Sequence, residues 1–310
     1  MGAVGLAALL PSIAISDEEL IQSRYKDTVL MIDCGSPKPE KWIEFLKWQE
    51  RINKNLDEKI GFTYFVTVGY LLAKSDDGLS KSVSDSVDLR NCLQEGVNRG
   101  NEIATHGFSN KDGKGWNVTQ WHNDLAYCDQ IVASALKDVE GDPYGAIGFR
   151  APQLGTNDAM FHALRENHYL YDCSVPTENS VNFEAKEGVV EIGVPYFKRD
   201  DGKKILGMSY NLHVHETSSA QYEKMLYDEL KRDGPLFISL DMMNRSNPGG
   251  ETYNDITYKF LRENSEKGAL KIKTMKDFVL IDLLKIVREV TPEPIEPQRR
   301  NVPEALTISV

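Results

Sequence analysis

The stretch VLMIDCGSPKPEKW, residues 29–42, decides the fold class of this chain. Four apolar residues run directly into Asp33 and Cys34. A short, continuously apolar run is typical of a strand buried on both faces, as in parallel sheets and barrels. Such folds bind their ligands at the carboxyl ends of the strands. The acid and the thiol at this strand end are therefore candidates for reaction chemistry.

Similar apolar runs recur along the chain and alternate with amphipathic stretches. Strands are predicted at 28–33, 62–69, 102–106, 146–151, 170–175, 190–196, 205–212, 236–241 and 270–273. Helices are predicted to begin near Pro39, Thr119, Thr156 or Asn157, and Thr217 or Ser218. Repeated βα units imply a mainly parallel sheet, closed or doubly wound. The clean units are too few for a regular eight-fold barrel, and residues 176–213 suggest a β excursion.

Composition excludes some classes of function. The 310-residue chain is 41% hydrophobic and carries a net charge of −11, which argues against a nucleic-acid partner because such proteins normally present a basic face. No apolar run is long enough to predict a transmembrane segment. The four cysteines show neither a CxxC pair nor zinc-finger spacing, so disulfides and buried thiols both stay open.

The two ends of the chain differ from its centre. Residues 1–16 are apolar with small residues near a cleavage-like Ala14–Ser16, and we interpret them as an export-signal remnant, although a basic start is missing. The alternative is an apolar segment packed across a barrel end. Residues 17–290 form the expected barrel domain, and the proline-rich residues 291–310 an extended tail. An extracytoplasmic location is expected.

Four predicted strand ends bear polar side chains. After Asp33 and Cys34 come His106, with Asn110 four residues later, then Arg150 and finally Asp241. A lone histidine is more often a structural residue than a ligand. Four polar strand ends in one barrel-like chain nevertheless favour a shared site.

Around these residues the sequence resembles the polysaccharide deacetylase family, the fourth carbohydrate esterase family. MIDCG matches the family motif T-F-D-D-G, HGFSN matches H-[ST]-x-x-H, and RAPQ matches R-x-P-Y. YLYDCSV, MSYNL and GPLFISLD resemble later segments, the last two those of the chitin and peptidoglycan deacetylase-like branch. The likeness follows a consistent order over residues 27–285, although no single motif is intact.

The resemblance implies a distorted, incomplete (β/α) barrel and a site residue by residue. Asp33 matches the catalytic base, and Arg150 matches the residue that orients it. Cys34, His106 and Asn110 stand at the three positions of metal ligands. The backbone N–H of Gln153 matches an oxyanion donor, and Asp241 stands where the family has a general acid. The implied cofactor is a divalent metal, zinc by preference.

Three of these positions depart from the family pattern. Cys34 replaces an aspartate but could bind zinc as a thiolate. Asn110 replaces a histidine, and its neutral amide oxygen is a poor zinc ligand. Asp241 replaces a histidine and could donate a proton only if its surroundings kept it protonated. The metal is therefore expected to bind weakly or not at all.

Other residues invite alternative interpretations. His213 and His215 stand two apart, so on a strand both rings would face one side. Two histidines on one exposed face are favoured over metal ligands, because the family takes no ligands from that segment. Trp116, Trp121 and Tyr210 could stack on sugar rings or simply pack.

The leading hypothesis is metal-assisted removal of N-acetyl groups from an N-acetylglucosamine polymer, peptidoglycan or chitin, by a hydrolase of non-peptide amide bonds. The alternative is a catalytically impaired homologue that binds glycan with a degraded metal site. A hydrolase of another substrate is a third reading, since fold alone does not fix function. In each glycan reading the expected partner is the polysaccharide.

Overall fold

The computed structural model describes residues 26–56, 59–72, 83–137, 139, 146–177 and 183–283. The predicted signal remnant (1–16) and extended tail (291–310) lie outside these residues, and the predicted domain boundaries stay predictions. No helix in the described part of the chain is long and apolar enough to cross a membrane.

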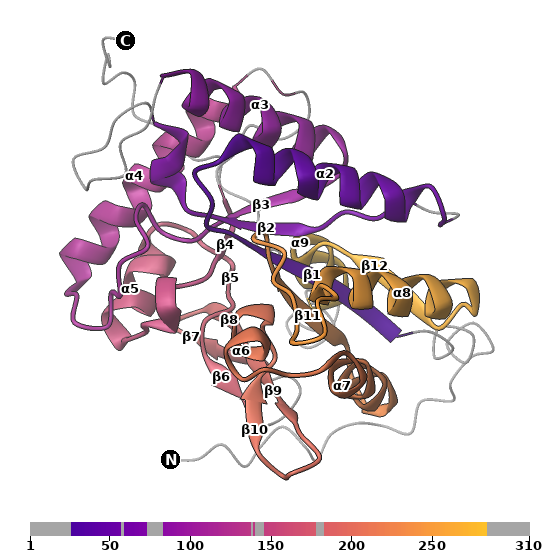
Figure 1. Cartoon of the computed structure of the whole chain (residues 1–310). Coiled ribbons are helices and arrows are strands. Elements are labelled where there is room, and N and C mark those ends of the chain that lie inside the picture. Colours follow the sequence, from indigo (N-terminus) through magenta and orange to yellow (C-terminus); the bar gives the residue numbers. More distant parts are fainter. Residues whose placement is uncertain are drawn as a thin grey trace, which may run out of the picture.

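A nine-stranded sheet forms the centre of the molecule (Figure 1). Its order is β11–β1–β2–β3–β4–β5–β8–β7, and β12 pairs additionally with β1. The strands are β1 Lys26–Cys34, β2 Thr63–Val66, β3 Glu102–Thr105, β4 Gly148–Phe149, β5 Tyr171–Asp172, β7 Phe183–Lys186, β8 Val189–Ile192, β11 Leu236–Asp241 and β12 Leu270–Lys273. All pairs are parallel except β7 with β8. Strands β11 and β7 stand at the two ends of this order, and within the described residues they do not pair with each other. The sheet is therefore an incomplete barrel, as predicted.

A smaller sheet follows in the predicted β excursion. It consists of β6 Pro176–Thr177, β9 Val194–Lys198 and β10 Lys204–Leu206 in the order β10–β9–β6. Met208 forms a parallel bridge to Ser239 of β11. The strand predicted at 205–212 is wrong beyond residue 206, because Ser209–Val214 form helix α6. There the Ser209 hydroxyl accepts a hydrogen bond from Asp241 N at 2.7 Å, and Leu212 is buried, so tertiary contacts override the local strand pattern.

Helices cover the outside of the sheet (Figure 1). They are α2 Pro39–Asn53, α3 Val83–Asn98, α4 Val118–Leu136, α5 Asp158–Glu166, α7 Ser219–Lys231, α8 Tyr253–Glu266 and α9 Met275–Asp277, with short helical turns η1 Val68–Leu71, η2 Pro152–Leu154 and η3 Phe278–Leu283. The predicted starts of α2, α5 and α7 are confirmed. Helix α4 is capped by Asn117 rather than by Thr119, in a reciprocal capping box with Gln120.

The side chains of β1 alternate between two apolar clusters. Leu30, Ile32 and Cys34 lie in the large cluster beneath helices α2, α3, α4, α7 and α8. Val29 and Met31 lie in the cluster inside the barrel. Successive side chains of a strand point to opposite faces, so Asp33 belongs to the inner face and Cys34 to the outer one.

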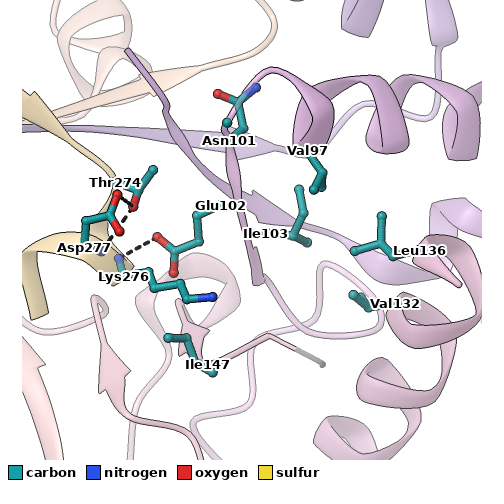
Figure 2. A pocket seen from close by; sticks show the side chains of 11 residues that line it. Val97, Asn101, Glu102, Ile103, Val132, Leu136, Ile147, Thr274, Lys276 and Asp277 are labelled. Atoms are coloured by element: carbon teal, nitrogen blue, oxygen red, sulfur yellow. Dashed lines mark hydrogen bonds between the residues drawn. The ribbon is translucent and has the colours of Figure 1, made fainter. Parts of the chain in front are cut away.

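A buried glutamate closes the amino end of the sheet. Glu102 accepts hydrogen bonds from Tyr171 Oη at 2.6 Å, Thr63 Oγ1 at 2.9 Å and Lys276 N at 2.7 Å, and thereby ties α9 to the strands. Burial raises the pKa of its carboxyl. Figure 2 shows the cavity of about 230 Å³ that Glu102 and Asp277 line there, and none of the sequence-predicted site residues takes part in it.

Candidate functional site

A larger cavity, of about 620 Å³, opens at the carboxyl edge of the sheet. Its lining includes five of the seven sequence-predicted site residues, namely Asp33, His106, Asn110, Gln153 and Asp241. The other two take different positions, since Arg150 lies directly behind Asp33 and Cys34 faces away. The carboxyl ends of the parallel strands thus bring together residues that are far apart in the sequence, as the sequence predicted.

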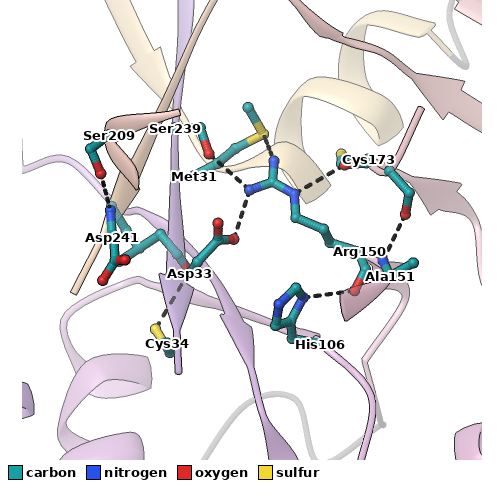
Figure 3. Close-up of polar contacts among 12 residues, drawn as sticks. Met31, Asp33, Cys34, His106, Arg150, Ala151, Cys173, Ser209, Ser239 and Asp241 are labelled. Carbon is teal, nitrogen blue, oxygen red and sulfur yellow. Dashed lines mark hydrogen bonds and ion pairs between the residues drawn. The ribbon is translucent and has the colours of Figure 1, made fainter. Parts of the chain in front are cut away.

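Arg150 is fully buried and fixes the position of Asp33 (Figure 3). Its Nη1 donates to Asp33 Oδ1 at 2.7 Å and to Ser239 Oγ at 2.8 Å. Its Nε donates to Cys173 O at 3.0 Å, and the guanidinium lies 4.3 Å from the ring centroid of Phe65. A buried guanidinium with these partners fixes the side chain of Asp33 on the cavity wall.

His106 presents a neutral imidazole to the cavity. Its Nδ1 lies 2.8 Å from Arg150 O, and since a carbonyl only accepts, Nδ1 carries the proton. Burial, the largest effect, lowers the pKa of the ring, while the charge of Asp33 opposes the shift. The lone pair of a neutral ring with this tautomer is on Nε2. After His106 the chain turns at Gly107, whose φ of 69° suits glycine.

The loop after Arg150 is strained at the cavity wall. Gln153 and Leu154 have φ values of 56° and 57°, in the left-handed region that side chains with a Cβ adopt at a cost of roughly 1–2 kcal/mol each. Gln153 Nε2 donates to Asn110 O at 3.1 Å and joins the two loops. No hydrogen bond of the Gln153 backbone N–H is found within the described residues, so this donor is available to a ligand.

Asp241 forms an ion pair, and the prediction that it acts as a general acid is not supported. Its Oδ1 accepts from Met243 N at 2.6 Å and its Oδ2 from Arg245 Nε at 3.0 Å. Both oxygens of Asp241 are therefore occupied as acceptors by groups of the protein, which is the arrangement of a structural ion pair rather than of a proton donor.

The prediction of Cys34 as a metal ligand is wrong for a physical reason. Its side chain is fully buried in the outer cluster, on the face of β1 opposite to Asp33, and its Sγ lies 3.5 Å from Ile32 O. Burial raises the pKa of this thiol well above its ordinary value, so it is not a thiolate. All four cysteines are free and buried. Of the two alternatives left open by the sequence, they are therefore buried thiols and not disulfides.

The donors that remain do not fit a zinc or other transition-metal site. No group of three or more His, Cys, Asp or Glu side chains within the described residues could hold a metal ion. His106 offers one nitrogen and Asn110 a neutral amide, while Asp33 is committed to Arg150. A structural or catalytic zinc site needs at least three such ligands.

The other sequence candidates are sorted by burial. Trp121 is fully buried in the core, and the partly buried Trp116 packs on it at 4.8 Å between ring centroids; neither lines the cavity. Tyr210 is 50% exposed and lines the cavity. His213 lies on α6 rather than on a strand, and its Nδ1 donates to Ser246 O at 2.7 Å. His215 follows the end of that helix, so the predicted shared strand face does not exist.

Sequence reasoning missed Arg245, Ser174 and Ser239. Arg245 was detectable as a basic residue four positions after a polar strand end. The two serines had no sequence signal, because their importance comes from their partners. Ser174 Oγ accepts from Ala151 N at 2.7 Å and donates to Asp172 Oδ1 at 2.6 Å, which fixes the loop that follows Arg150.

The strand register places Asp172 of β5 opposite Glu191 of β8, and two buried carboxyls meet there. Burial and the neighbouring Asp172 raise the pKa of Glu191 to about 11. Burial also raises the pKa of Asp172, whose two oxygens accept from Ser174 N at 3.0 Å and Ser174 Oγ at 2.6 Å. The pair therefore retains a proton at neutral pH.

This proton predicts a dependence of stability on pH. The folded-state pKa of Glu191, about 11, exceeds the ordinary 4.5, so its stabilising contribution is complete below 4.5 and is lost as pH rises toward 11. We expect Glu191→Gln to flatten the fall in unfolding free energy between about pH 6 and 9 by up to roughly 1.4 kcal/mol per pH unit. Urea denaturation at several pH values measures this, with exposed Glu44→Gln as the control. Parallel pH profiles for wild type and Glu191→Gln would contradict it.

Comparison with known proteins places this geometry in a fold. No family model and no curated protein matches the sequence. A candidate polysaccharide deacetylase from Mycobacterium smegmatis aligns with a TM-score of 0.56 at 17% identity, covering 88% of this chain and 94% of that chain. A family 4 acetyl xylan esterase from Clostridium thermocellum, in complex with a cobalt ion, aligns with a TM-score of 0.50 at 14% identity, covering 83% and 91% of the two chains.

A CE4 family pseudoenzyme from Bacillus anthracis is similar as well. It aligns with a TM-score of 0.51 at 8% identity, covering 82% of this chain and 65% of that chain. A mutant of that pseudoenzyme with restored enzymatic activity aligns with a TM-score of 0.50. The chain therefore has the fold of the carbohydrate esterase 4 structures, a distorted (β/α) barrel, which confirms the predicted resemblance and fold class. Esterases and a pseudoenzyme share this fold, so it fixes neither activity nor branch.

Proposed function

We propose that the protein binds an N-acetylated glycan in the cavity at the carboxyl edge of the sheet, and that the metal-assisted hydrolysis typical of its fold is impaired. One observation carries this proposal, namely that the cavity keeps Asp33, His106 and the exposed Tyr210 while position 34 faces the core. Carboxylates, amides and an open aromatic face suit the hydroxyls and ring faces of sugars.

The size and the lining of the cavity support a sugar ligand. Its volume of about 620 Å³ matches that of ordinary small-molecule sites. Tyr210 and Met243 line the cavity and are 50% and 42% exposed. Apolar surface that is open beside polar groups marks a binding surface. Glycan polymers of this kind lie outside the cytoplasm, so the proposal includes an extracytoplasmic location.

Deacetylation is the second candidate, because the groups that a hydrolase needs besides a metal are present. Asp33 is fixed by Arg150, His106 has its lone pair on Nε2, and the Gln153 N–H is available to an oxyanion. These three groups favour acyl chemistry on an acetamide over other reactions. A binding protein has no evident need for all three.

Two measurements on one preparation separate the candidates. Binding of chitotetraose is measured by calorimetry, and acetate release from chitotetraose, peptidoglycan fragments and acetylated xylan is measured with and without added Zn²⁺ or Co²⁺. The proposal expects binding without acetate release. Acetate release that Asp33→Asn abolishes would establish the deacetylase instead, and absence of both binding and release would overturn both candidates.

A further inference from the structure

Two Asp–Arg pairs stand side by side on the cavity wall. Asp33 of β1 and Asp241 of β11 are register partners in adjacent parallel strands. Asp33 pairs with Arg150 at 2.7 Å and Asp241 with Arg245 at 3.0 Å. The two carboxylates occupy equivalent positions in neighbouring strands, whereas the two arginines come from different loops and differ in their surroundings.

The two arginines differ in how many of their donors are used inside the protein. Arg150 is fully buried, and Nε, Nη1 and Nη2 all have protein partners. The Arg245 side chain donates a hydrogen bond through Nε to Asp241, and it is 28% exposed. Within the described residues no hydrogen bond of its two terminal amino groups is found. Arg245 lines the cavity, so these donors are available there.

Arg245 is held in place although its terminal amino groups are not bonded. Asp241 accepts from its Nε, and its guanidinium carbon lies 4.8 Å from the ring centroid of Tyr210. Contact with a carboxylate on one side and an aromatic face on the other restricts the plane of the guanidinium. A planar fork with a fixed orientation loses little entropy when it binds a second pair of oxygens.

The charges of the cavity leave this fork able to accept an anion. The two carboxylates on the wall, Asp33 and Asp241, are balanced by their ion pairs with Arg150 and Arg245. A negative group beside Arg245 would therefore face a cavity wall without net charge, although the net charge of the whole chain is −11. The nearest competing charge is Asp241, which already uses both oxygens for Met243 N and Arg245 Nε.

We propose that Arg245 is a specificity-determining residue that binds a carboxylate on the glycan, so that the ligand is an acidic N-acetylated sugar rather than a neutral one. This inference rests on the proposed glycan binding and names its substrate class. Two parallel N–H···O bonds from a guanidinium to a carboxylate are shorter and stronger than bonds to neutral hydroxyls. The interaction supplies selectivity that the remaining amide and aromatic groups of the cavity lack.

The test compares matched sugars that differ in their carboxylate. N-acetylglucosamine is compared with N-acetylmuramic acid, and chitotetraose with a hyaluronan tetrasaccharide, by calorimetry at low and high salt. The acidic member of each pair is expected to bind at least about tenfold more tightly at low salt, with the advantage shrinking at high salt. Arg245→Gln is expected to remove the difference, Arg245→Lys to retain part of it, and Arg262→Gln on α8 to change nothing.

Each outcome decides between the two proposals. Equal binding of neutral and acidic sugars would overturn the role of Arg245 and leave glycan binding standing. Glucuronic acid, an acidic sugar without an N-acetyl group, is measured alongside them. If it binds in an Arg245-dependent manner and no N-acetylated sugar binds, the carboxylate site stands and the N-acetyl proposal fails. Binding of no sugar at all to folded wild-type protein would overturn both. Thermal unfolding of each variant verifies that lost binding reflects the missing guanidinium.

Discussion

Cys34→Asp, the substitution that would restore the family residue, is expected to destabilise the protein by about 3–5 kcal/mol rather than to create a metal site. The side chain at position 34 lies in the outer cluster with Leu30 and Ile32, fully buried beneath the helices. Burial and the neighbouring negative charges of Asp33 and Asp241 already raise the pKa of the Cys34 thiol, and they disfavour a carboxylate at this position in the same way. Urea denaturation measures the loss.

Cys34→Ser is the matched control, because it is polar and of similar size but uncharged. We expect it to cost about 1–2 kcal/mol, so that the difference from Cys34→Asp isolates the buried charge. If Cys34→Asp with Asn110→His is as stable as the serine variant and binds stoichiometric Zn²⁺, position 34 faces the cavity and our assignment of its side is wrong.

Asp33→Ala is expected to lower the free energy of unfolding by about 3 kcal/mol and to abolish ligand binding. The substitution leaves the guanidinium of Arg150, which is completely buried, without its carboxylate. Removing one partner of a buried pair is costly because the remaining charge stays desolvated. Urea denaturation and calorimetry on the same variant measure the two effects.

A double variant separates the charge from the contact. Asp33→Ala with Arg150→Met removes both charges, and we expect it to recover at least half of the stability lost in Asp33→Ala. Ligand binding is not expected to return, because the cavity wall lacks the carboxylate in both variants. Full additivity of the two single substitutions would show that the pair contributes little and would contradict the structural role assigned to it.

The fold was predictable from short segments of sequence because parallel strands buried on both faces are continuous apolar runs. The runs at 28–33, 236–241 and 270–273 predicted β1, β11 and β12 almost to the residue. Helix α3 was not predicted, since SVSDSVDLRNCLQEGVN shows a weak apolar stripe among polar residues. Helix α6 was mistaken for a strand because its local pattern is ambiguous and its contacts with β11 are not visible in sequence.

The sequence predicted which residues lie near the candidate site, but not the direction in which each side chain points. The strand-end rule found Asp33, His106 and Asp241, since any polar residue at a parallel strand end reaches the same edge. It could not assign the side of Cys34, because a one-residue difference along a strand reverses the face. It also missed the ion pair of Asp241, because Arg245 reaches it through a loop whose path depends on the whole fold.

Strand β1 has a consequence for how the chain reaches its folded state. It pairs with β2, but also with β11 and β12, and its first residue, Lys26, lies in register with Leu270. During synthesis an edge of β1 therefore stays unpaired until residues 236–241 and 270–273 have been made. Contacts so distant in sequence slow folding and expose sticky strand edges to aggregation. Recovery of soluble protein should therefore improve when synthesis is slowed or chaperones are added.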